Sequence, residues 1–365
     1  MRLAIVGPTF PYKGGAARHV TELAHRLTAA GHQVCIESWR AQYPRRLYPG
    51  RQTVDVPEFP TFPASRRDLA WYRPDGWWRV GRRLAGSVDA VVLAVYSPVQ
   101  VPPYLGLLAG LGRGVPVVAL VNNVLPHERR PVDVALVRWL LGRVTSVFVH
   151  SAEQAALART LTRRPVRWAP LAPHLPVPAQ PLPIPDEPFR RLLFFGLVRP
   201  YKGLDVLLRA LAAGPPDVRL RVAGEFWGGT AETEALVVEL GLGARVDLYP
   251  GYVPSEDLPT RFAEVDALVL PYRAATASQN AWIAHQFGVP VIATRAGALA
   301  DPVRDGVDGL VCAADDVADL TRAITLFYTD GEALRLRSAV RPVDPEPIWQ
   351  RYLATLLDGA EPPGR

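Results

Sequence analysis

Residues 194–211 read F-F-G-L-V-R-P-Y-K-G-L-D-V-L-L-R-A-L and hold one complete strand-to-helix unit. An apolar strand predicted over 192–195 ends at Gly196, and a helix with one apolar face follows. Arg199 and Lys202 stand three residues apart in the loop between them. Because ligands of open α/β sheets bind at the carboxyl ends of the strands, the two cations predict an anion site that suits a diphosphate. The alternative is that both are solvated surface charges.

The same alternation of short apolar runs and helical segments extends along the chain in both directions from this unit. Such alternation is typical of a parallel sheet covered by helices. In the first half we predict strands at 2–6, 33–38, 89–95, 116–121 and 146–150, with helices at about 17–30, 102–111, 133–142 and 152–161. In the second half we predict strands at 192–195, 218–223, 245–248, 267–270, 290–293 and 309–312, with helices at 203–213, 231–240, 281–287 and 315–327. The predicted fold class is α/β, with two doubly wound Rossmann-like domains.

A proline-rich segment separates the two halves. Residues 169–189 contain eight prolines, which neither a helix nor a central strand accommodates. We therefore predict a first domain over 1–168, a linker over 169–189, a second domain over 190–345, and an amphipathic helix and tail over 346–365. If the two domains face one another, their ligand lies in the cleft between them. Whether the last helix packs back across the first domain is left open by the sequence.

Composition narrows the class of protein. The formal net charge of +6 is too dilute over 365 residues for nucleic-acid binding, but it suits an anionic ligand. Cys35 and Cys312 lack the spacing of metal ligands, so we expect no metal site and a reducing compartment. The opening apolar run is too short for a signal peptide, and prolines and glycines interrupt the apolar stretch 88–121. We therefore expect a cytoplasmic protein without a membrane span.

Only two of the 41 basic side chains are lysines, Lys13 and Lys202, and each stands beside glycine. Lysine presents a compact charge to phosphate, and glycine lets the main chain approach a ligand closely. In the loop 7–19, Gly14 and Gly15 precede a predicted helix whose first N–H groups can hold an anion. The alternative for this loop is a tight turn without a ligand.

Another polar cluster precedes a predicted helix in the stretch 270–294. Its members are Thr276, Ser278, Gln279 and Asn280. Side-chain oxygens in such positions cap the helix, and the free N–H groups of its first turn point toward an anion. Helix capping alone also explains Ser278 and Asn280.

Several segments resemble, in order and spacing, those of the family 4 glycosyltransferases. They are K-G-G-A-A-R-H-V-T-E-L-A-H-R-L-T-A-A-G-H-Q-V (13–34), K-G-L-D-V-L-L-R-A-L (202–211), G-V-P-V-I-A-T-R-A-G (288–297) and D-G-V-D-G-L-V-C-A-A-D-D (305–316). A subgroup also shares Y-P-R-R-L-Y-P-G (43–50) and N-V-L-P-H-E (123–128). The resemblance covers about residues 1–355. It implies a retaining sugar-nucleotide transferase with two facing domains, the GT-B fold.

The resemblance also implies roles for individual residues. Lys202 and Arg199 would hold the donor diphosphate, and the donor would be a UDP- or GDP-linked sugar without any other cofactor. The remaining donor-binding residues come from loops of both domains: Lys13, Gly14, Gly15, Gly196, Tyr252, Val253, Thr276, Ser278, Gln279 and Asn280. Tyr252 and Val253 would line the pocket for the nucleotide base. On the acceptor side the candidates are His19, Asn122 and Asn123.

Four positions depart from the family pattern. Many members carry two glutamates, eight residues apart, where this chain has Ala275 and Ile283. A common arginine is replaced by Leu197, and a common histidine by Asn122. The subgroup with an A-T-x-S-type loop also lacks the glutamates, so loss of catalysis does not follow. Recognition of the sugar hydroxyls must nevertheless differ from that of the glutamate-bearing members.

His127 is the best protein candidate for a hydrogen bond near the reacting sugar, and Glu128 can orient it. In a retaining reaction of this family type, the donor phosphate itself can take the acceptor proton. Neither a protein nucleophile nor a metal is then required. The alternatives are that His127 is structural and that Glu128 pairs with Arg129 or Arg130.

An aromatic and basic stretch occupies residues 65–84, S-R-R-D-L-A-W-Y-R-P-D-G-W-W-R-V-G-R-R-L. Such a stretch can contact an anionic membrane that carries a lipid-linked acceptor, or it can stack on a sugar acceptor. The alternative is a partly packed surface helix whose arginines extend to solvent.

The leading hypothesis is a glycosyltransferase that uses a glycan, lipid-linked or small-molecule hydroxyl as acceptor. One alternative is a nucleotide-sugar-binding protein without transferase activity, and another is a sugar-nucleotide epimerase, which the missing glutamates disfavour. A dehydrogenase is disfavoured because neither domain has the G-x-G-x-x-G pattern and Glu37 is a weak ribose-binding candidate. The oligomeric state is open.

Overall fold

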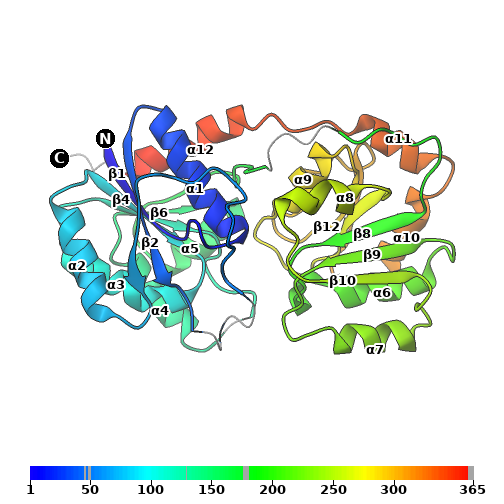
Figure 1. Cartoon of the computed structure of the whole chain (residues 1–365), viewed down its shortest axis with the longest axis horizontal. Coiled ribbons are helices and arrows are strands. Elements are labelled where there is room, and N and C mark those ends of the chain that lie inside the picture. Colours follow the sequence, from blue (N-terminus) through cyan, green and yellow to red (C-terminus); the bar gives the residue numbers. More distant parts are fainter. Residues whose placement is uncertain (45–46, 48–50, 129, 176–180, 361–365) are drawn as a thin grey trace. The chain divides into compact units, whose positions relative to one another are not determined.

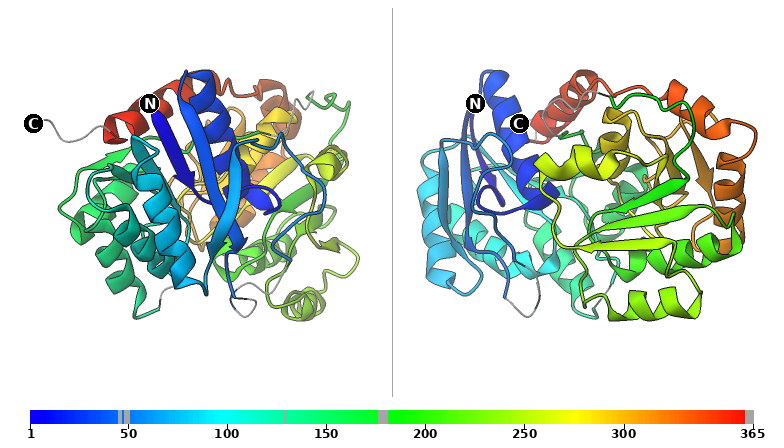
Figure 2. Two further views of the ribbon diagram at one scale, coloured as in Figure 1. Left: turned by 60° about the vertical axis from the view of Figure 1, so that its left-hand side comes forward. Right: turned by 45° about the vertical axis from the view of Figure 1, so that its right-hand side comes forward.

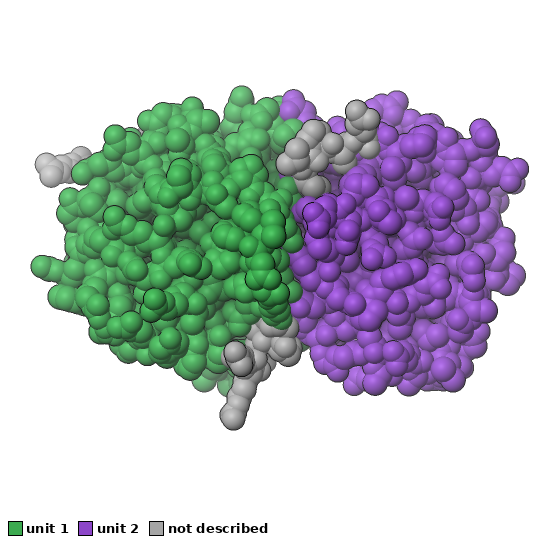
Figure 3. Space-filling model, in the orientation of Figure 1, with its two compact units in different colours: residues 1–174, 345–365 green, residues 175–344 purple. Residues whose placement is uncertain are grey.

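The computed structural model describes residues 1–44, 47, 51–128, 130–175 and 181–360. The chain divides into two compact units (Figure 3). Unit 1 comprises Met1–His174 and Pro345–Arg365, and unit 2 comprises Leu175–Asp344. Among the predictions above, Arg129 and parts of 43–50, 169–189 and 346–365 lie outside the described residues.

Unit 1 is built on a seven-stranded parallel sheet in the order β3-β2-β1-β4-β5-β6-β7 (Figure 1). The strands are β1 (Arg2–Val6), β2 (Gln33–Ala41), β3 (Ser65–Ala70), β4 (Ala90–Val95), β5 (Val117–Val121), β6 (Ser146–Val149) and β7 (Val166–Trp168). The helices are α1 (Gly14–Ala29), α2 (Pro74–Ala85), α3 (Val101–Leu111), α4 (Asp133–Leu141), α5 (Ala152–Leu161) and α12 (Glu346–Ala360). The middle strands β4 and β5 are apolar and buried throughout, as expected for strands covered on both faces.

Helices cover both faces of the unit 1 sheet (Figure 2). Helices α1 and α12 pack on one face, where Leu23 and Leu27 share a core with Trp349 and Leu356. Helices α2, α3, α4 and α5 pack on the other face. The packing partner of the C-terminal helix, which the sequence left open, is therefore the sheet of the first unit.

The proline-rich segment is divided between the two units where it is described. Residues next to β7 stay with unit 1: the Ala169 amide donates to the Val149 carbonyl at 3.2 Å, and Ala172 is fully buried in the α1–α12 core. In unit 2, the Leu182 amide donates to the Phe287 carbonyl at 3.0 Å. The first unit thus extends to His174, beyond the predicted boundary at 168, because short hydrogen-bonded stretches fit between the prolines.

Unit 2 repeats the architecture with a six-stranded parallel sheet in the order β10-β9-β8-β11-β12-β13. Its strands are β8 (Arg191–Phe195), β9 (Arg219–Gly224), β10 (Val246–Pro250), β11 (Ala267–Leu270), β12 (Val291–Thr294) and β13 (Gly309–Cys312). Its helices are α6 (Leu204–Ala213), α7 (Ala231–Glu239), α8 (Leu258–Phe262), α9 (Asn280–Gln286), α10 (Val317–Phe327) and α11 (Glu332–Ala339). Helices α6, α7, α10 and α11 pack on one face, and α8 and α9 pack on the other. The prediction of two doubly wound α/β domains is confirmed.

The stretch 65–84 is not one surface helix. It begins with the edge strand β3, which pairs with β2, and α2 begins only at Pro74. We predicted no strand here because Arg66, Arg67 and Asp68 interrupt the apolar pattern. Edge strands carry such charges readily, since one side of the strand faces solvent. Among the described residues, no helix is both long and apolar enough to cross a membrane.

Candidate functional site

The loops after β8, β9 and β11 approach one another closely at the carboxyl edge of the unit 2 sheet. Gly196 follows β8 with φ of 107°, and Gly224 ends β9. A Cβ on Gly224 would lie 1.7 Å from the Gly196 carbonyl oxygen, so no other residue fits there. Gly203, before α6, has φ of 65°, and a Cβ there would lie 2.1 Å from the Pro271 carbonyl oxygen. These glycines let the backbone segments meet.

Two polar side chains lie close to Gly196. A Cβ at Gly196 would lie 3.1 Å from Asn280 Nδ2 and 3.8 Å from Lys202 Nζ. The Lys202 ammonium also lies 4.8 Å from the centre of the Tyr272 ring. The lack of a side chain at Gly196 therefore lets an ammonium group and an amide N–H₂ group approach the backbone here, and the ammonium group is one that donates hydrogen bonds to anions.

The charge on Lys202 is secure at neutral pH. Partial burial lowers the pKa of Lys202, but the phenol oxygens of Tyr272 and Tyr201 more than offset this, and the pKa lies above its usual value. Within the described residues, no carboxylate forms an ion pair with Lys202. Its charge is therefore held by aromatic and hydroxyl groups and remains available to an anionic ligand.

Asn280 is positioned by hydrogen bonds from the start of α9. Its Nδ2 donates to the Phe195 carbonyl at 2.9 Å and to the Tyr272 hydroxyl at 3.4 Å, and its backbone N–H donates to Ser278 Oγ at 3.2 Å. Ser278 thus accepts from the first residue of α9, although the helix N-cap itself is Gln279. Thr276, by contrast, is only 6% exposed, and its carbonyl accepts from the Ala298 amide at 3.4 Å. Gln279 directly precedes the helix and is half-buried.

The other residues of unit 2 that we predicted to bind the sugar donor are Arg199, Tyr252 and Val253, and each has different surroundings. The Arg199 guanidinium stacks over the ring of Trp227, with Cζ 4.3 Å from its centre. The backbone that leads to Tyr252 is fixed because the Gly251 amide donates to the Gly224 carbonyl at 2.9 Å. Val253 is half-buried and packs against the α8–α9 core.

In unit 1, the predicted glycine loop lies at the carboxyl end of β1. Gly14 has φ of 81° and begins α1, and Gly15 is exposed. The Lys13 amide donates to the Gln52 carbonyl at 3.2 Å. The first turn of α1 contains no acidic residue, so its dipole is not neutralised there.

His19, which we predicted to bind an acceptor, is buried in the core of unit 1. His19 is 1% exposed, and its Nε2 lies 2.9 Å from the Tyr352 hydroxyl of α12. Its ring stacks on Trp349 and lies beside two further buried histidines, His150 and His174. Burial lowers the pKa of His19 to about 4. Position 19 faces inward because it lies on the buried stripe of α1, and this left it no contact with solvent.

The loop after β5 carries the remaining candidates. Asn122 and Asn123 are half-buried, and the Asn122 amide donates to the Val95 carbonyl at 3.0 Å. His127 is half-buried and Glu128 is exposed. The next residue after Val95, Tyr96, donates its hydroxyl to the Ala16 carbonyl in the first turn of α1 at 3.1 Å. Tyr96 was not singled out from the sequence, and it joins the end of β4 to the start of α1.

A cavity of about 670 Å³ lies in unit 1 at the opposite, amino edge of the sheet. Its lining includes Glu37, which is 2% exposed and pairs with Arg83 at 2.7 Å, and burial raises the Glu37 pKa. Glu37 thus serves an ion pair in the α2 interface and not a ribose. Both cysteines are free thiols, and no cluster of metal-ligating side chains occurs in the described ranges.

Comparison with known proteins connects this geometry to a family. A model described as Glycosyltransferase Family 4 matches residues 13–172, and one described as Glycosyl transferases group 1 matches residues 189–330. The D-inositol 3-phosphate glycosyltransferase of Mycobacterium sp. (strain KMS) is 38% identical over 151 residues, which cover 40% of this chain and 34% of that protein. That of Mycobacterium tuberculosis (strain ATCC 25177 / H37Ra) is 37% identical over 147 residues, 39% of this chain and 30% of that protein. The matched part thus spans about a third of these relatives.

Solved structures agree with the fold over nearly the whole chain. Sucrose-phosphate synthase from Thermosynechococcus elongatus has a TM-score of 0.74 at 19% identity, with 99% of this chain and 100% of that chain covered. Anabaena HepE in complex with UDP-glucose has a TM-score of 0.74 at 15% identity, with 98% and 100% covered. At these identities the likeness concerns the fold, which both domains share with known glycosyltransferase structures. The two family models cover both units, and the chain belongs to the family 4 glycosyltransferases.

Proposed function

We propose that this chain transfers a sugar from a nucleoside-diphosphate donor to a hydroxyl acceptor, with retention of anomeric configuration and without a metal. Family membership supports the reaction class, and the Lys202 ammonium beside Gly196, at the carboxyl edge of the unit 2 sheet, carries the proposal for the donor site. No carboxylate neutralises the ammonium in the described structure, so the site favours an anion.

In the proposed reaction the bond between the anomeric carbon and the donor phosphate oxygen breaks, and the acceptor oxygen forms a new bond on the same face of the sugar. The acceptor proton moves to the departing phosphate oxygen, so the reaction needs no protein nucleophile. Lys202 stabilises the charge that grows on the diphosphate. Arg199 would add to this stabilisation, although its guanidinium stacks on Trp227 in the described state.

Unit 1 would supply the acceptor side and the second set of anion contacts. The N–H groups at Gly14 and Gly15 would approach the diphosphate, with Lys13 beside them. Asn122, Asn123, His127 and Glu128 would then face the reacting sugar and the acceptor. Support for this grouping comes from the end of β4, where the Val95 carbonyl accepts from the Asn122 amide and the Tyr96 hydroxyl donates to the Ala16 carbonyl in the first turn of α1.

UDP and GDP are the nucleotides we favour, with Tyr252 and Val253 near the base. A panel of UDP, GDP, ADP, CDP and dTDP in thermal unfolding tests this, because a ligand at one hundred times its dissociation constant stabilises a fold by about 2.7 kcal/mol. We expect one nucleotide to shift the wild type and not Lys202→Ala. Shifts that persist in the variant would remove Lys202 from the site.

Donor consumption that depends on an added acceptor separates a transferase from a nucleotide-sugar-binding protein or an epimerase. We expect turnover only with an acceptor, unchanged turnover in excess EDTA, and a product with the anomeric configuration of the donor. Consumption without an acceptor, or none with any acceptor class, would favour the alternatives.

We also propose that the enzyme works in the cytoplasm and touches an anionic membrane through unit 1. Trp71, Tyr72 and Trp78 are 39%, 54% and 50% exposed, and arginines of β3 and α2 lie beside them in the sequence. Aromatic rings and arginines together suit the headgroup region. Co-sedimentation with vesicles containing anionic lipid should fall several-fold for Trp71→Ala/Trp78→Ala. Equal binding to neutral vesicles would contradict the proposal.

A further inference from the structure

Arg273, in the loop after β11, donates side-chain hydrogen bonds to three different residues. Its Nη1 and Nη2 donate to the two carboxylate oxygens of Asp205, each at 2.7 Å. Its Nε donates to Asp315 at 2.7 Å, and Nη1 also donates to the Pro200 carbonyl at 3.0 Å. Its backbone N–H donates to the Tyr201 carbonyl at 2.8 Å.

These partners belong to two segments at the carboxyl edge of the unit 2 sheet. Pro200, Tyr201 and Asp205 surround Lys202 in the turn after β8, whereas Asp315 follows β13. Arg273 lies 68 residues from Asp205 and 42 residues from Asp315, and it therefore connects the turn that bears Lys202 to the loop after β13. A bidentate arginine–carboxylate pair fixes orientation as well as distance.

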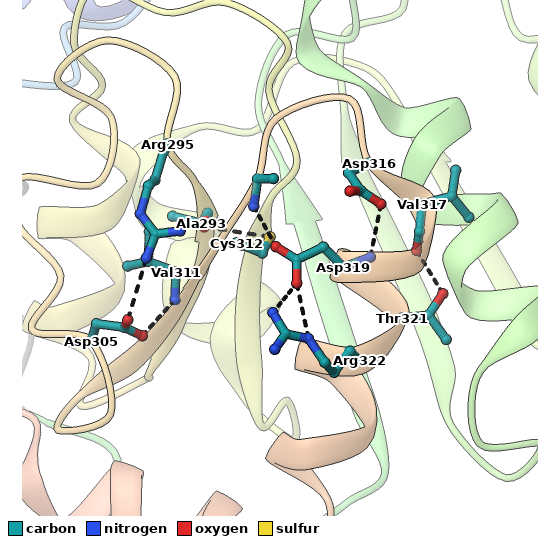
Figure 4. A network of polar contacts seen from close by, with 11 residues as sticks. Ala293, Arg295, Asp305, Val311, Cys312, Asp316, Val317, Asp319, Thr321 and Arg322 are labelled. Carbon is teal, nitrogen blue, oxygen red and sulfur yellow. Dashed lines mark hydrogen bonds and ion pairs between the residues drawn. The ribbon is translucent and has the colours of Figure 1, made fainter.

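The loop after β13 is itself a fixed anchor. Asp319 accepts a hydrogen bond from the Ala313 amide at 2.7 Å, and Asp316 accepts one from the Asp319 amide at 2.9 Å (Figure 4). Asp305 holds the preceding strand by accepting from the Val311 amide at 2.9 Å. Asp315 has φ of 56°, which a non-glycine residue adopts only where its surroundings hold it.

Arg273 is unsuited to bind phosphate itself. Two carboxylates already pair with its guanidinium, so the group of three carries no surplus positive charge. The Asp205 carboxylate raises the pKa of Arg273, and Arg273 in turn lowers the pKa of Asp205, so both stay ionised at neutral pH. Nearby, Tyr272 places its ring 4.8 Å from Lys202 Nζ and accepts from Asn280 Nδ2. A substitution at Arg273 would thus shift the positions of Lys202 and Asn280 through Tyr272, the residue next to it in the chain.

We infer that Arg273 is a positioning residue, which ties the Lys202 turn to the β11 and β13 loops and so sets where the Lys202 ammonium stands. What Lys202 binds rests on the proposed function. The tie itself does not, because it is a property of the folded chain. Arg273 then acts on donor affinity only through Lys202 and its neighbours.

The test compares Arg273→Gln and Arg273→Lys with Arg304→Gln in the full chain. Arg304 is a matched control, since it pairs with the buried Asp308 at 2.7 Å and donates to the Ala339 carbonyl at 2.9 Å, next to the opposite end of β13. We expect both Arg273 variants to weaken binding of the preferred nucleoside diphosphate about tenfold or more, and Arg304→Gln to change it less than about twofold. Arg273→Lys should not restore nucleotide binding, because lysine lacks the planar guanidinium that pairs with both carboxylate oxygens of Asp205.

Two readouts separate positioning from the alternatives. In a Lys202→Ala background, Arg273→Gln should weaken nucleotide binding by less than a further factor of about two, because Arg273 acts on the ligand through Lys202. A full tenfold loss in that background would mean that Arg273 contacts the ligand and would overturn the inference. Amide hydrogen exchange decides the tie without any ligand: exchange at Lys202 and Gly203 should quicken about tenfold or more in Arg273→Gln, or to a lesser degree in Asp315→Asn if the first variant fails to fold. Rates equal to those of Arg304→Gln would refute the tie, whereas a wild type that binds no nucleotide would refute only the proposed function.

Discussion

The buried histidines beneath α12 should make unit 1 sensitive to acid. His150 is 2% exposed, its ring stacks on Tyr352 at 5.8 Å, and neither ring nitrogen makes a hydrogen bond of good geometry within the described residues. Burial, with His19 close by, lowers the pKa of His150 to about 3. His174 also faces this group, and burial lowers its pKa, with a contribution from Arg18.

The sign follows from proton linkage. An unfolded histidine titrates near pH 6.5, so the unfolded chain takes up protons below that pH while the folded chain does not until about pH 3 at His150. Stability is therefore full above about pH 6.5 and falls as the pH drops. At pH 5, about 1.5 units below the unfolded value, each such histidine costs about 2 kcal/mol. Together, His150 and His19 should lower the free energy of unfolding at pH 5 by about 4 kcal/mol.

The informative variant is His150→Phe, which keeps an aromatic ring against Tyr352 and removes the titrating group. Denaturant unfolding at pH 8 and pH 5 measures the change. Between pH 8 and pH 5, the free energy of unfolding should fall by about 2 kcal/mol less in the variant than in the wild type. At pH 8 the two free energies of unfolding should agree within about 1 kcal/mol. His25→Phe is the control, because His25 is a half-buried histidine of α1 that packs against Phe62, away from the buried histidines beneath α12. Equal acid loss in wild type and His150→Phe would refute the linkage.

Three further predictions concern the candidate site. Lys202→Ala should weaken nucleotide binding at least about tenfold in isothermal titration, and Lys13→Ala much less; equal, negligible effects would argue against the lysine reasoning. His127→Ala should lose turnover with near-normal nucleotide affinity, and unchanged turnover would remove it from the site. Gly203→Ala should destabilise the fold by more than about 2 kcal/mol, because its Cβ would overlap a carbonyl, while Gly241→Ala, with a similar φ of 67° and open space, should cost about 1–2 kcal/mol. Similar losses for the two glycines would show that the overlap is relieved.

The architecture was predictable because its signals are local. Buried parallel strands are short apolar runs, and β4, β5, β8 and β11 all appear as such in the sequence. The edge strand β3 does not, since its first four residues are polar or charged and its apolar residues begin only at Leu69. The grouping of Gly196, Lys202 and Asn280 was also within reach, because parallel strands bring their carboxyl ends to one edge.

What the sequence could not show depends on partners far along the chain. His19 hydrogen-bonds to Tyr352, 333 residues away, and only this contact reveals that position 19 belongs to a core. The role of Arg273 similarly rests on Asp205 and Asp315. A polar residue near a glycine loop looks the same in sequence whether it faces a ligand or a distant helix. Motif spacing therefore predicts which loops meet, and not which side chains remain available there.

The scarcity of lysine acquires a physical meaning at the unit 2 edge. The arginines there are already engaged: Arg273 is held by two carboxylates, and Arg199 stacks on Trp227. A planar guanidinium with five donors finds such partners easily within a protein. The Lys202 ammonium instead lies over Tyr272, close to Gly196, with no carboxylate paired to it in the described structure. Lys202→Arg should therefore fail to restore nucleotide affinity, since the larger, flatter group would reach Asp205 or overlap Asn280. Wild-type affinity in Lys202→Arg would show that positive charge alone is sufficient at this position.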